Sequence, residues 1–519
     1  MLLKYFFNKA EKKSNTSELA LLLLITSISL YFRVTGLSQE SFWINEADNT
    51  RVYYFTSARE MLAWGPSEVL GIGAYSLLYY FYALLSPEGF LLESEFGYRL
   101  PSAIFSTITI PMLYFISKRY ANPIISLAVC SIWAFNPLGF ELGRWFYSYP
   151  MWTFFTLLAL LSYFQLVDSI RQNRTKKHNW ILFHTVSLIT FMSNIFIILA
   201  YLCVIPHFLS TISSVSKTAK DRNRLAISAF APHFLPCAYI IQRSLRLSKQ
   251  GFEETSWISS TPGNPMLHVM EISFPSAHNL LFIMLLFLLI NLVYRLTVAI
   301  GSFKELSDIL WTHLGSDKSP LILASIAQPM VFIMLGILGS PSWEDRYMGH
   351  LIPLWQLSLV FLFIPRDFSL SLERGGPFDF IPPLSMFLVI FISLFSSVSQ
   401  VSFEENAVKQ DVRASIQFVS DEWNSTERSA IITQPSPQIY RYYLDRYDLN
   451  PEFFEGSWED VDSVTLDTII SSKPDVIFRI RLVEFSDSTG FLSTISENYI
   501  LVEEFSSTGM VVQKWELSR

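Results

Sequence analysis

The chain has 519 residues, of which 51% are hydrophobic and only 16% are charged, and its net charge is −7. Soluble proteins usually carry about 25% charged residues, so the composition excludes a disordered, collagen-like or disulfide-scaffold protein. The acidic balance offers no basic patch for nucleic acid. Cys130, Cys203 and Cys237 lie inside apolar runs and suit packing better than a disulfide framework or zinc site. Because the apolar residues form membrane-length runs, we expect a helical protein that crosses a membrane repeatedly.

Apolar runs, taken in chain order, predict an α-helical polytopic membrane protein with about eleven transmembrane helices. The expected spans cover residues 19–34, 100–117, 121–140, 145–167, 179–210 as two short helices, 225–242, 278–299, 320–340, 348–364 and 380–399. The apolar segment 74–85 is shorter than the roughly 20 residues that a span needs. We therefore expect this tyrosine-rich segment to lie along the membrane surface.

Lysine and arginine in short loops indicate the cytoplasmic side of a membrane. Basic residues precede the first span and recur at Lys118-Arg119, in 171–177 and in 217–224. We therefore expect residues 1–18 to be cytoplasmic and residues 19–400 to form the transmembrane domain. The acidic stretch 37–98 is expected to be an outer loop. The sequence contains no retention signal, which favours the plasma membrane.

From residue 401 to residue 519 the composition is that of a soluble domain. The patterns predict helices over 412–423 and 438–446, and strands over 429–434, 475–482, 499–505 and 507–517. Strands that alternate with helices predict a small α/β domain, which the topology places on the extracytoplasmic side. We interpret this domain as a structural or acceptor-binding cap.

Ionisable residues gather at the outer ends of the predicted spans, where side chains can reach the level of the lipid headgroups. Glu46 and Asp48 follow the first span in the segment FWINEADNTRV. Carboxylates at this position could accept a proton from a substrate or bind a divalent cation. Arg99 stands at the start of the span over 100–117.

Two outer turns carry the other candidate residues. Arg144 and Tyr147 lie among aromatic residues in 136–150, and this arginine could pair with Glu141 or bind a phosphate. The turn over 339–353 crowds three ionisable side chains and a tyrosine into a short connection, which solvation alone does not explain. These four residues are Glu344, Asp345, Arg346 and Tyr347. We interpret His350, one turn further on, as a packing residue.

Taken in this order, the motifs resemble the GT-C superfamily of membrane glycosyltransferases, especially protein O-mannosyltransferases and aminoarabinose transferases. The matching motifs are the acidic segment with Glu46, the segment Arg99-Leu100-Pro101-Ser102-Ala103, the hairpin from Asn136-Pro137 to Arg144, and Arg346-Tyr347. Two departures stand out. Asn45 occupies the position of a family aspartate, and residues 71–75 lack the family's basic residue and prolines.

The resemblance implies an enzyme that moves a sugar from a polyprenyl-phosphate donor to a hydroxyl of an acceptor protein, lipid or glycan, with inversion. Glu46 or Asp48 would then be the catalytic base, and Mg²⁺ or Mn²⁺ could bridge these carboxylates to the phosphate. The expected donor-phosphate ligands are Arg99, Arg144, Arg346 and Tyr347. The expected substrate-binding residues are Tyr147, Glu344 and Asp345.

Two other functions remain open. The departures at Asn45 and at residues 71–75 favour a non-catalytic scaffold or accessory subunit that keeps the enzyme fold. A lipid or solute transporter is the other alternative. A transporter usually has internal repeats, broken helices and charges near the middle of the membrane, whereas these charge clusters lie at the ends of the predicted spans.

Overall fold

The computed structural model describes residues 16–39, 41–42, 46, 94–174, 176–193, 197–251, 265–286, 289, 316–337, 349–364, 377–400, 410–434, 437–456, 463–483 and 489–518. The chain divides into two compact units. The helical unit contains the described residues up to Thr35 and from Arg99 to Gln400. The α/β unit contains those of 36–46, 94–98 and 410–518. The α/β unit therefore includes the described part of the expected outer loop as well as the tail.

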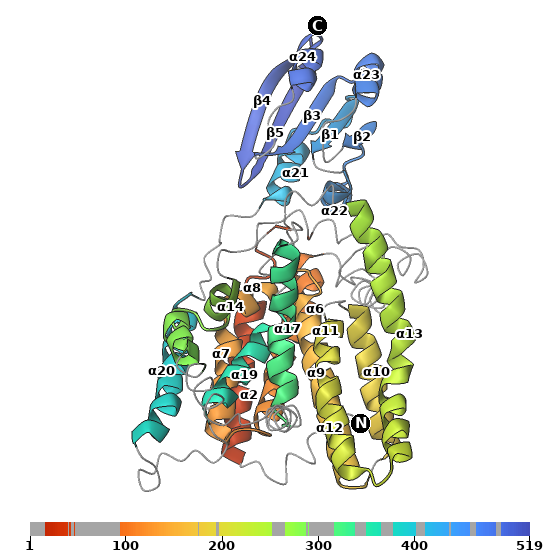
Figure 1. Cartoon of the computed structure of the whole chain (residues 1–519). Helices are drawn as coiled ribbons and strands as arrows, with labels where there is room; N and C mark the ends of the chain where they lie inside the picture. Colours follow the sequence, from red (N-terminus) through yellow and green to blue (C-terminus); the bar gives the residue numbers. More distant parts are fainter. Residues whose placement is uncertain are drawn as a thin grey trace. The chain divides into compact units, whose positions relative to one another are not determined.

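The helical unit is built from helices that run mostly alongside one another (Figure 1). They are α2 (Thr16–Val34), α6 (Glu95–Ser117), α7 (Pro123–Phe135), α8 (Pro137–Leu142), α9 (Tyr149–Arg171), α10 (Lys177–Ser193), α11 (Ile197–Leu202), α12 (Val204–Val215), α13 (Ala219–Gly251), α14 (Pro265–Ser273), α17 (Ser319–Ile337), α19 (Ile352–Phe363) and α20 (Pro377–Gln400). Among the described residues, α2, α6, α9 and the segment Pro383–Gln400 are long and apolar enough to cross a membrane. Four shorter apolar helices accompany them, and the count of about eleven spans stays a prediction.

The expected helix over 121–140 is wrong, because the chain forms two helices there, α7 and α8. Asn136 separates them: its backbone N–H donates to the carbonyl of Trp133, and its side chain accepts a hydrogen bond from the N–H of Gly139. Pro137 then occupies the first position of α8, which suits proline because no helical N–H is needed there. The expected break near residues 193–194 stays a prediction, because α10 is described up to Ser193 and α11 from Ile197, and residues 194–196 lie outside the described residues. Most of the expected span 278–299 and all of segment 74–85 lie outside the described residues.

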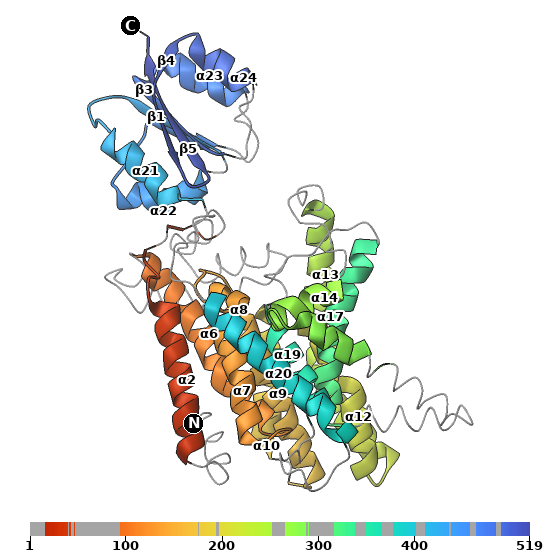
Figure 2. The same ribbon diagram turned by 90° about the vertical axis from the view of Figure 1, so that its left-hand side faces the viewer.

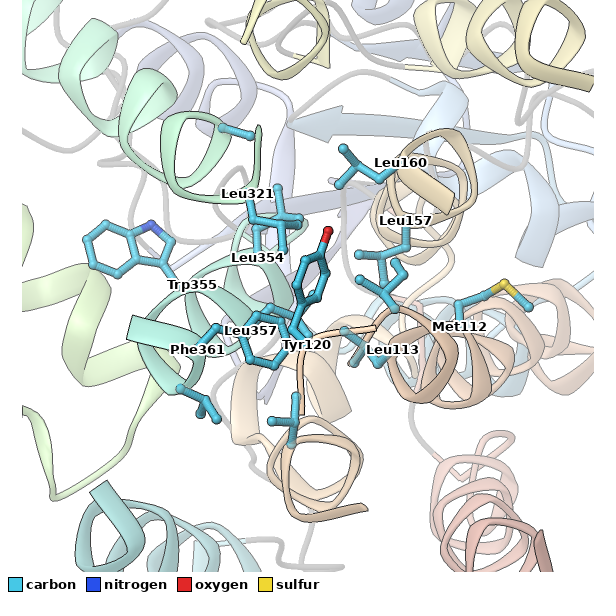
Figure 3. Packing of buried hydrophobic residues seen from close by; sticks show 14 of the residues in the cluster. Met112, Leu113, Tyr120, Leu157, Leu160, Leu321, Leu354, Trp355, Leu357 and Phe361 are labelled. Carbon is cyan, nitrogen blue, oxygen red and sulfur yellow. The ribbon is translucent and has the colours of Figure 1, made fainter. Parts of the chain in front are cut away.

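Buried apolar side chains from helices far apart in the sequence form the core of the helical unit (Figure 3). Leu113 of α6 and Leu157 of α9 belong to the same cluster as Leu354 of α19. The ring of Tyr120 lies 4.9 Å from that of Phe361, centroid to centroid. Large apolar side chains are also exposed on α2, α13 and α20. Outward apolar faces of this kind are expected where helices meet lipid.

Ion pairs join the helix ends that carry the basic segments. Lys118, after α6, lies 2.8 Å from a carboxylate oxygen of Glu18 in the first turn of α2. Arg119 makes a two-bond contact with Asp168 near the end of α9, at 2.7 and 2.9 Å. The start of α2 and the ends of α6 and α9 therefore lie together. The predicted topology, in which successive spans run in opposite directions, requires these three helix ends to lie on the same side.

A polar chain extends this end of the unit towards α12 and α17. An oxygen of Asp317 lies 2.6 Å from Arg171 and 3.1 Å from Nε2 of His207, whose Nδ1 lies 2.7 Å from the hydroxyl of Tyr163. Burial by itself would raise the pKa of Asp317, but the hydrogen bonds from His207 and Arg171 lower this pKa well below its usual range. The carboxylate therefore stays ionised and holds three helices together.

The α/β unit contains a mixed five-stranded sheet with the order β2-β1-β3-β5-β4. Its elements are α21 (Val412–Asp421), β1 (Ser429–Gln434), α22 (Gln438–Arg446), β2 (Phe453–Gly456), α23 (Ser463–Ser472), β3 (Val476–Leu482), α24 (Thr489–Ser496), β4 (Tyr499–Ser507) and β5 (Met510–Leu517). The strands expected at β1, β3, β4 and β5 are confirmed, as are the helices α21 and α22. The elements β2, α23 and α24 were not expected from the sequence.

Helices cover both faces of the central strands (Figure 2). Every residue of β1 is buried, as is typical of a strand that pairs in parallel on both sides. Ile432 of β1 and Ile477 of β3 pack with Leu466 of α23 and Ile495 of α24. On the other side of the sheet lie α21 and α22. The antiparallel strands β4 and β5 meet at a turn in which Gly509 has a φ of 69°, a value that favours glycine.

A buried carboxylate holds the beginning of α6 within the α/β unit. Glu95, only 2% exposed, lies 3.0 Å from Arg446 and 3.3 Å from Arg413, and it accepts a hydrogen bond of 3.1 Å from Tyr443. Burial lowers the pKa of Arg446, but the charge of Glu95 and its hydrogen bond raise this pKa more, so Arg446 stays charged. Beside it, the N–H of Phe42 donates to the hydroxyl of Tyr443 at 2.9 Å.

Replacing Glu95 should destabilise the α/β unit. A Glu95→Gln change keeps the size of the side chain but leaves Arg413 and Arg446 without a counter-charge, so we expect a loss of about 1–3 kcal/mol in unfolding free energy. The control is Glu452→Gln, which breaks a solvent-exposed pair with Arg428 and should have a much smaller effect on stability. Denaturation of the purified protein in detergent measures both. Equal effects of the two changes would contradict the role of Glu95.

Candidate functional site

Arg144 lies just beyond α8 and closes the end of α2. One guanidinium nitrogen, NH1, donates hydrogen bonds to the carbonyls of Phe32, at 3.2 Å, and Thr35, at 2.5 Å. Carbonyls at the last turn of a helix lack partners inside the helix and carry partial negative charge, so a cation is favourable there. The guanidinium carbon also lies 5.4 Å from the centre of the Phe140 ring. Arg144 is therefore fixed at the end of α2 where the expected outer loop begins.

Arg33 is a second arginine at this place, and the sequence analysis missed it. It is completely buried in the last turn of α2. Its Nε donates to the hydroxyl of Ser106 at 2.8 Å, and its NH1 donates to the carbonyl of Ala134 at 2.9 Å and to the hydroxyl of Ser29. A charged residue at the end of an apolar run was the available signal, because a buried arginine inside a membrane protein is costly and usually has a function.

The two arginines form one structural group, which we call the arginine pair. Arg33 binds the last turn of α7 through Ala134, and Arg144 binds the last turn of α2. Both guanidinium groups lie near the ring of Phe140, Arg33 at 5.9 Å from its centre. A Cβ atom at Gly143 would lie 2.8 Å from the Ser106 hydroxyl and 3.0 Å from Nε of Arg33. The close packing therefore requires glycine directly before Arg144.

Arg33 also has unused hydrogen-bonding capacity. Its NH2 group is buried and has no hydrogen-bond partner among the described residues. No carboxylate is paired with Arg33 in that part of the chain, so serine hydroxyls and a carbonyl surround the charge. The C-terminal end of α2 is therefore electropositive, which suits an anionic group such as a phosphate.

Tyr147 and Arg99 belong to the same region of the helical unit. The Tyr147 ring stacks on that of Tyr149 with a centroid distance of 4.6 Å, and the Tyr147 carbonyl accepts a hydrogen bond of 3.0 Å from Ser102, one turn after Arg99. Arg99 itself is buried, with 3% of its surface exposed. The structure therefore brings α6 and the segment around Tyr147 together.

The structure describes only some of the remaining expected site residues. Glu46 is described as a buried helical residue of the α/β unit. Asp48 and the turn residues Glu344, Asp345, Arg346 and Tyr347 lie outside the described residues. His350 is described and is buried, with its ring 6.3 Å from that of Trp152, as expected for a packing residue. Among the described residues, no group of three or more histidine, cysteine, aspartate or glutamate side chains could hold a metal ion.

A polar cavity of about 360 Å³ lies beside α8. Carboxylates, an imidazole, a hydroxyl and an amide line it, contributed by α8, α14, the turn after α14 and the end of α20. The polar lining residues are Glu141, Glu271, Ser276, His278 and Gln400. The sequence analysis noted only the first of these residues, because α8 and α14 are far apart in the sequence.

Buried side chains hold the walls of this polar cavity in place. The amide of Asn136, fully buried, donates to the carbonyl of Ile272 in α14 at 2.7 Å. Gln356 of α19, also fully buried, donates to the carbonyl of Ser273 at 3.0 Å. Ser396 of α20 lies in hydrogen-bond contact with two lining residues, Ser276 at 2.8 Å and Gln400 at 3.0 Å. Hydrogen bonds between neighbouring segments therefore join the walls of the cavity.

Comparisons by sequence find no relative. No protein-family model matches the chain, and no curated protein matches it either.

Comparisons by structure find similar proteins over almost the whole chain. The apo crystal structure of ArnT from Cupriavidus metallidurans is 12% identical, has a TM-score of 0.50, and matches over 96% of this chain and 98% of its own. ArnT bound to undecaprenyl phosphate has 11% identity and a TM-score of 0.49 over 95% and 97%. The oligosaccharyltransferase AglB from Archaeoglobus fulgidus, in complex with an inhibitory peptide and a dolichol-phosphate, has 9% identity and a TM-score of 0.46 over 98% and 74%.

At this level of identity, the match with the apo ArnT structure shows the fold. Its match extends through both the helical unit and the α/β unit of this chain, and it covers nearly the whole of both proteins. The fold expected from the order of the sequence motifs is therefore confirmed: this chain has the fold of the GT-C membrane glycosyltransferases.

Proposed function

We propose that this protein is a membrane glycosyltransferase that moves a sugar from a polyprenyl-phosphate donor to an acceptor hydroxyl. The observation that carries the proposal is the arginine pair at the C-terminal end of α2, within a fold shared with ArnT. ArnT has been solved with undecaprenyl phosphate bound. A lipid of this type needs apolar helices for its tail and cations for its phosphate, and the helical unit offers both.

The arginines would act on the leaving group. As the bond between the sugar and the phosphate breaks, negative charge grows on the phosphate oxygens. Fixed guanidinium groups stabilise that charge without needing to reorganise, which lowers the barrier. In this proposal Arg144 binds the phosphate, with Arg99, Arg346 and Tyr347 as further ligands. Arg33 is a positioning residue that holds α2 and α7 in register beside it.

The attack on the sugar needs a base for the acceptor hydroxyl. Glu46 or Asp48 would take the proton, and direct attack from the face opposite the phosphate would invert the anomeric carbon. Tyr147, Glu344 and Asp345 are the proposed substrate-binding residues. Mg²⁺ or Mn²⁺ could neutralise the phosphate through Glu46 and Asp48, because hard oxygen ligands suit these ions. The acceptor would be a protein, lipid or glycan, and the reaction would take place on the outer face of the plasma membrane.

Consumption of a lipid-linked sugar tests the proposed function. The purified protein, incubated with undecaprenyl phosphate that carries mannose, glucose or arabinose, should release undecaprenyl phosphate from at least one donor when an extract of membrane acceptors is present. Chromatography of the lipid products measures the release. Release only in the presence of a partner enzyme would favour a scaffold. Movement of intact lipid between leaflets without cleavage would favour a transporter.

Replacing the proposed base should abolish transfer but spare donor binding. We expect Glu46→Gln, Asp48→Asn or the double change to lower the transfer rate by about 10²–10⁴-fold, because proton transfer by a positioned side chain contributes about that much. The control is Glu427→Gln, at an exposed residue of the α/β unit. The assignment is wrong if the double variant folds, as judged by its unfolding temperature, and transfers at the wild-type rate.

Removing the charge of Arg144 should weaken binding of the donor phosphate. We expect Arg144→Gln to raise the dissociation constant of undecaprenyl phosphate at least tenfold, because the variant loses the charge that binds the phosphate. A factor of ten corresponds to about 1.4 kcal/mol of binding free energy. The exposed Lys220→Gln, on α13, removes a charge elsewhere and should change binding less than twofold. Scintillation proximity binding in nanodiscs provides the measurement. Unchanged affinity in folded Arg144→Gln would count against the phosphate role.

A further inference from the structure

The polar cavity between α8, α14 and α20 differs in charge from the arginine pair. Glu141 and Glu271 both line it, and none of its described lining residues is a lysine or arginine. The Nδ1 atom of His268 lies 4.0 Å from the carboxylate of Glu271. A phosphate would be repelled by two carboxylates, so this cavity suits a neutral or cationic ligand.

The remaining lining groups favour a ligand with many hydroxyls. Ionised carboxylates accept hydrogen bonds and cannot donate them, so they pair with O–H donors. The amide of Gln400 and the hydroxyl of Ser276 can both donate and accept. His278 adds an imidazole to the lining of the cavity. These groups can accept hydrogen bonds from neighbouring hydroxyls and donate hydrogen bonds to them.

The size and the hydrogen-bonded walls of the cavity also suit a small polar molecule. Its volume of about 360 Å³ falls in the range of roughly 300–1,000 Å³ that small-molecule sites occupy. Asn136, Gln356 and Ser396 fix its walls through hydrogen bonds from α8, α19 and α20. Sites in which buried neighbours hold the lining groups lose little entropy when a ligand binds.

We propose that this polar cavity binds the ring hydroxyls of a sugar, through Glu141, Glu271, His278 and Gln400. The choice of a sugar as ligand rests on the proposed function, and the ring can belong to the donor or to a glycan acceptor. The side of α8 that faces α2 would then bind phosphate, and the side that faces α14 would bind sugar. Both groups of one donor lipid could lie against the same short helix.

Protection of a cysteine tests this binding directly, without any transfer reaction. Ser276→Cys is introduced into full-length protein that carries Cys130→Ala, Cys203→Ala and Cys237→Ala, and its labelling by a maleimide is timed. We expect at least one of mannose, glucose and arabinose, at up to 100 mM, to slow labelling at least threefold. Glu271→Gln should remove this protection, whereas Asp221→Asn, at an exposed residue of α13, should keep it. Gln400→Cys, on another wall, provides a second labelled position if Ser276→Cys does not fold.

Three results would overturn the proposal: no protection by any sugar, protection by inorganic phosphate instead, or protection by Mn²⁺ alone. A donor sugar and an acceptor sugar are separated by kinetics. If the ring belongs to the donor, Glu271→Gln weakens binding of the sugar-bearing lipid but not of undecaprenyl phosphate. If it belongs to the acceptor, the same change raises only the KM for acceptor. A protein that binds free sugar at this cavity but cleaves no donor would contradict the proposed function and leave the cavity assignment standing.

Discussion

The helical unit depends on arginine side chains that bind backbone carbonyls at the ends of neighbouring helices. Arg33, in the last turn of α2, binds a carbonyl of α7. Arg144, which follows α8, binds the carbonyls at the end of α2. Each cation satisfies groups that a helix end leaves unpaired, and each gains from the negative end of a helix dipole. Gly143 and Ser106 provide the space that these contacts need. Loss of either arginine would therefore affect the position of the other.

This constraint also arranges charge around α8. The arginine pair lies towards α2, whereas Glu141 lines a cavity shared with α14 and α20. Basic and acidic side chains thus both lie near one short helix. A lipid phosphate that carries a sugar has two corresponding parts. Its phosphate is anionic and suits the arginine pair, and its sugar is neutral, bears hydroxyls and suits the polar cavity. The proposed function and the proposed sugar cavity both follow from that match.

The sequence predicted those features that depend on local patterns. Apolar runs predicted most helices, and alternating segments predicted β1, β3, β4 and β5, because burial follows the period of each element. The break at Asn136 was missed, although Asn-Pro within an apolar run is a signal for a new helix start. The contacts of Glu95 with Arg446 and of Asn136 with Ile272 join residues far apart in the chain. No local pattern encodes such pairs, so the polar cavity could not be predicted.

The most direct test of the account is a structure of the protein in a lipid nanodisc with undecaprenyl phosphate bound. The account predicts the phosphorus within hydrogen-bonding range of the Arg144 guanidinium, with the lipid tail along the apolar helices and the polar cavity free of phosphate. A phosphate held in the polar cavity, or at the helix ends that carry Lys118 and Arg171, would contradict it.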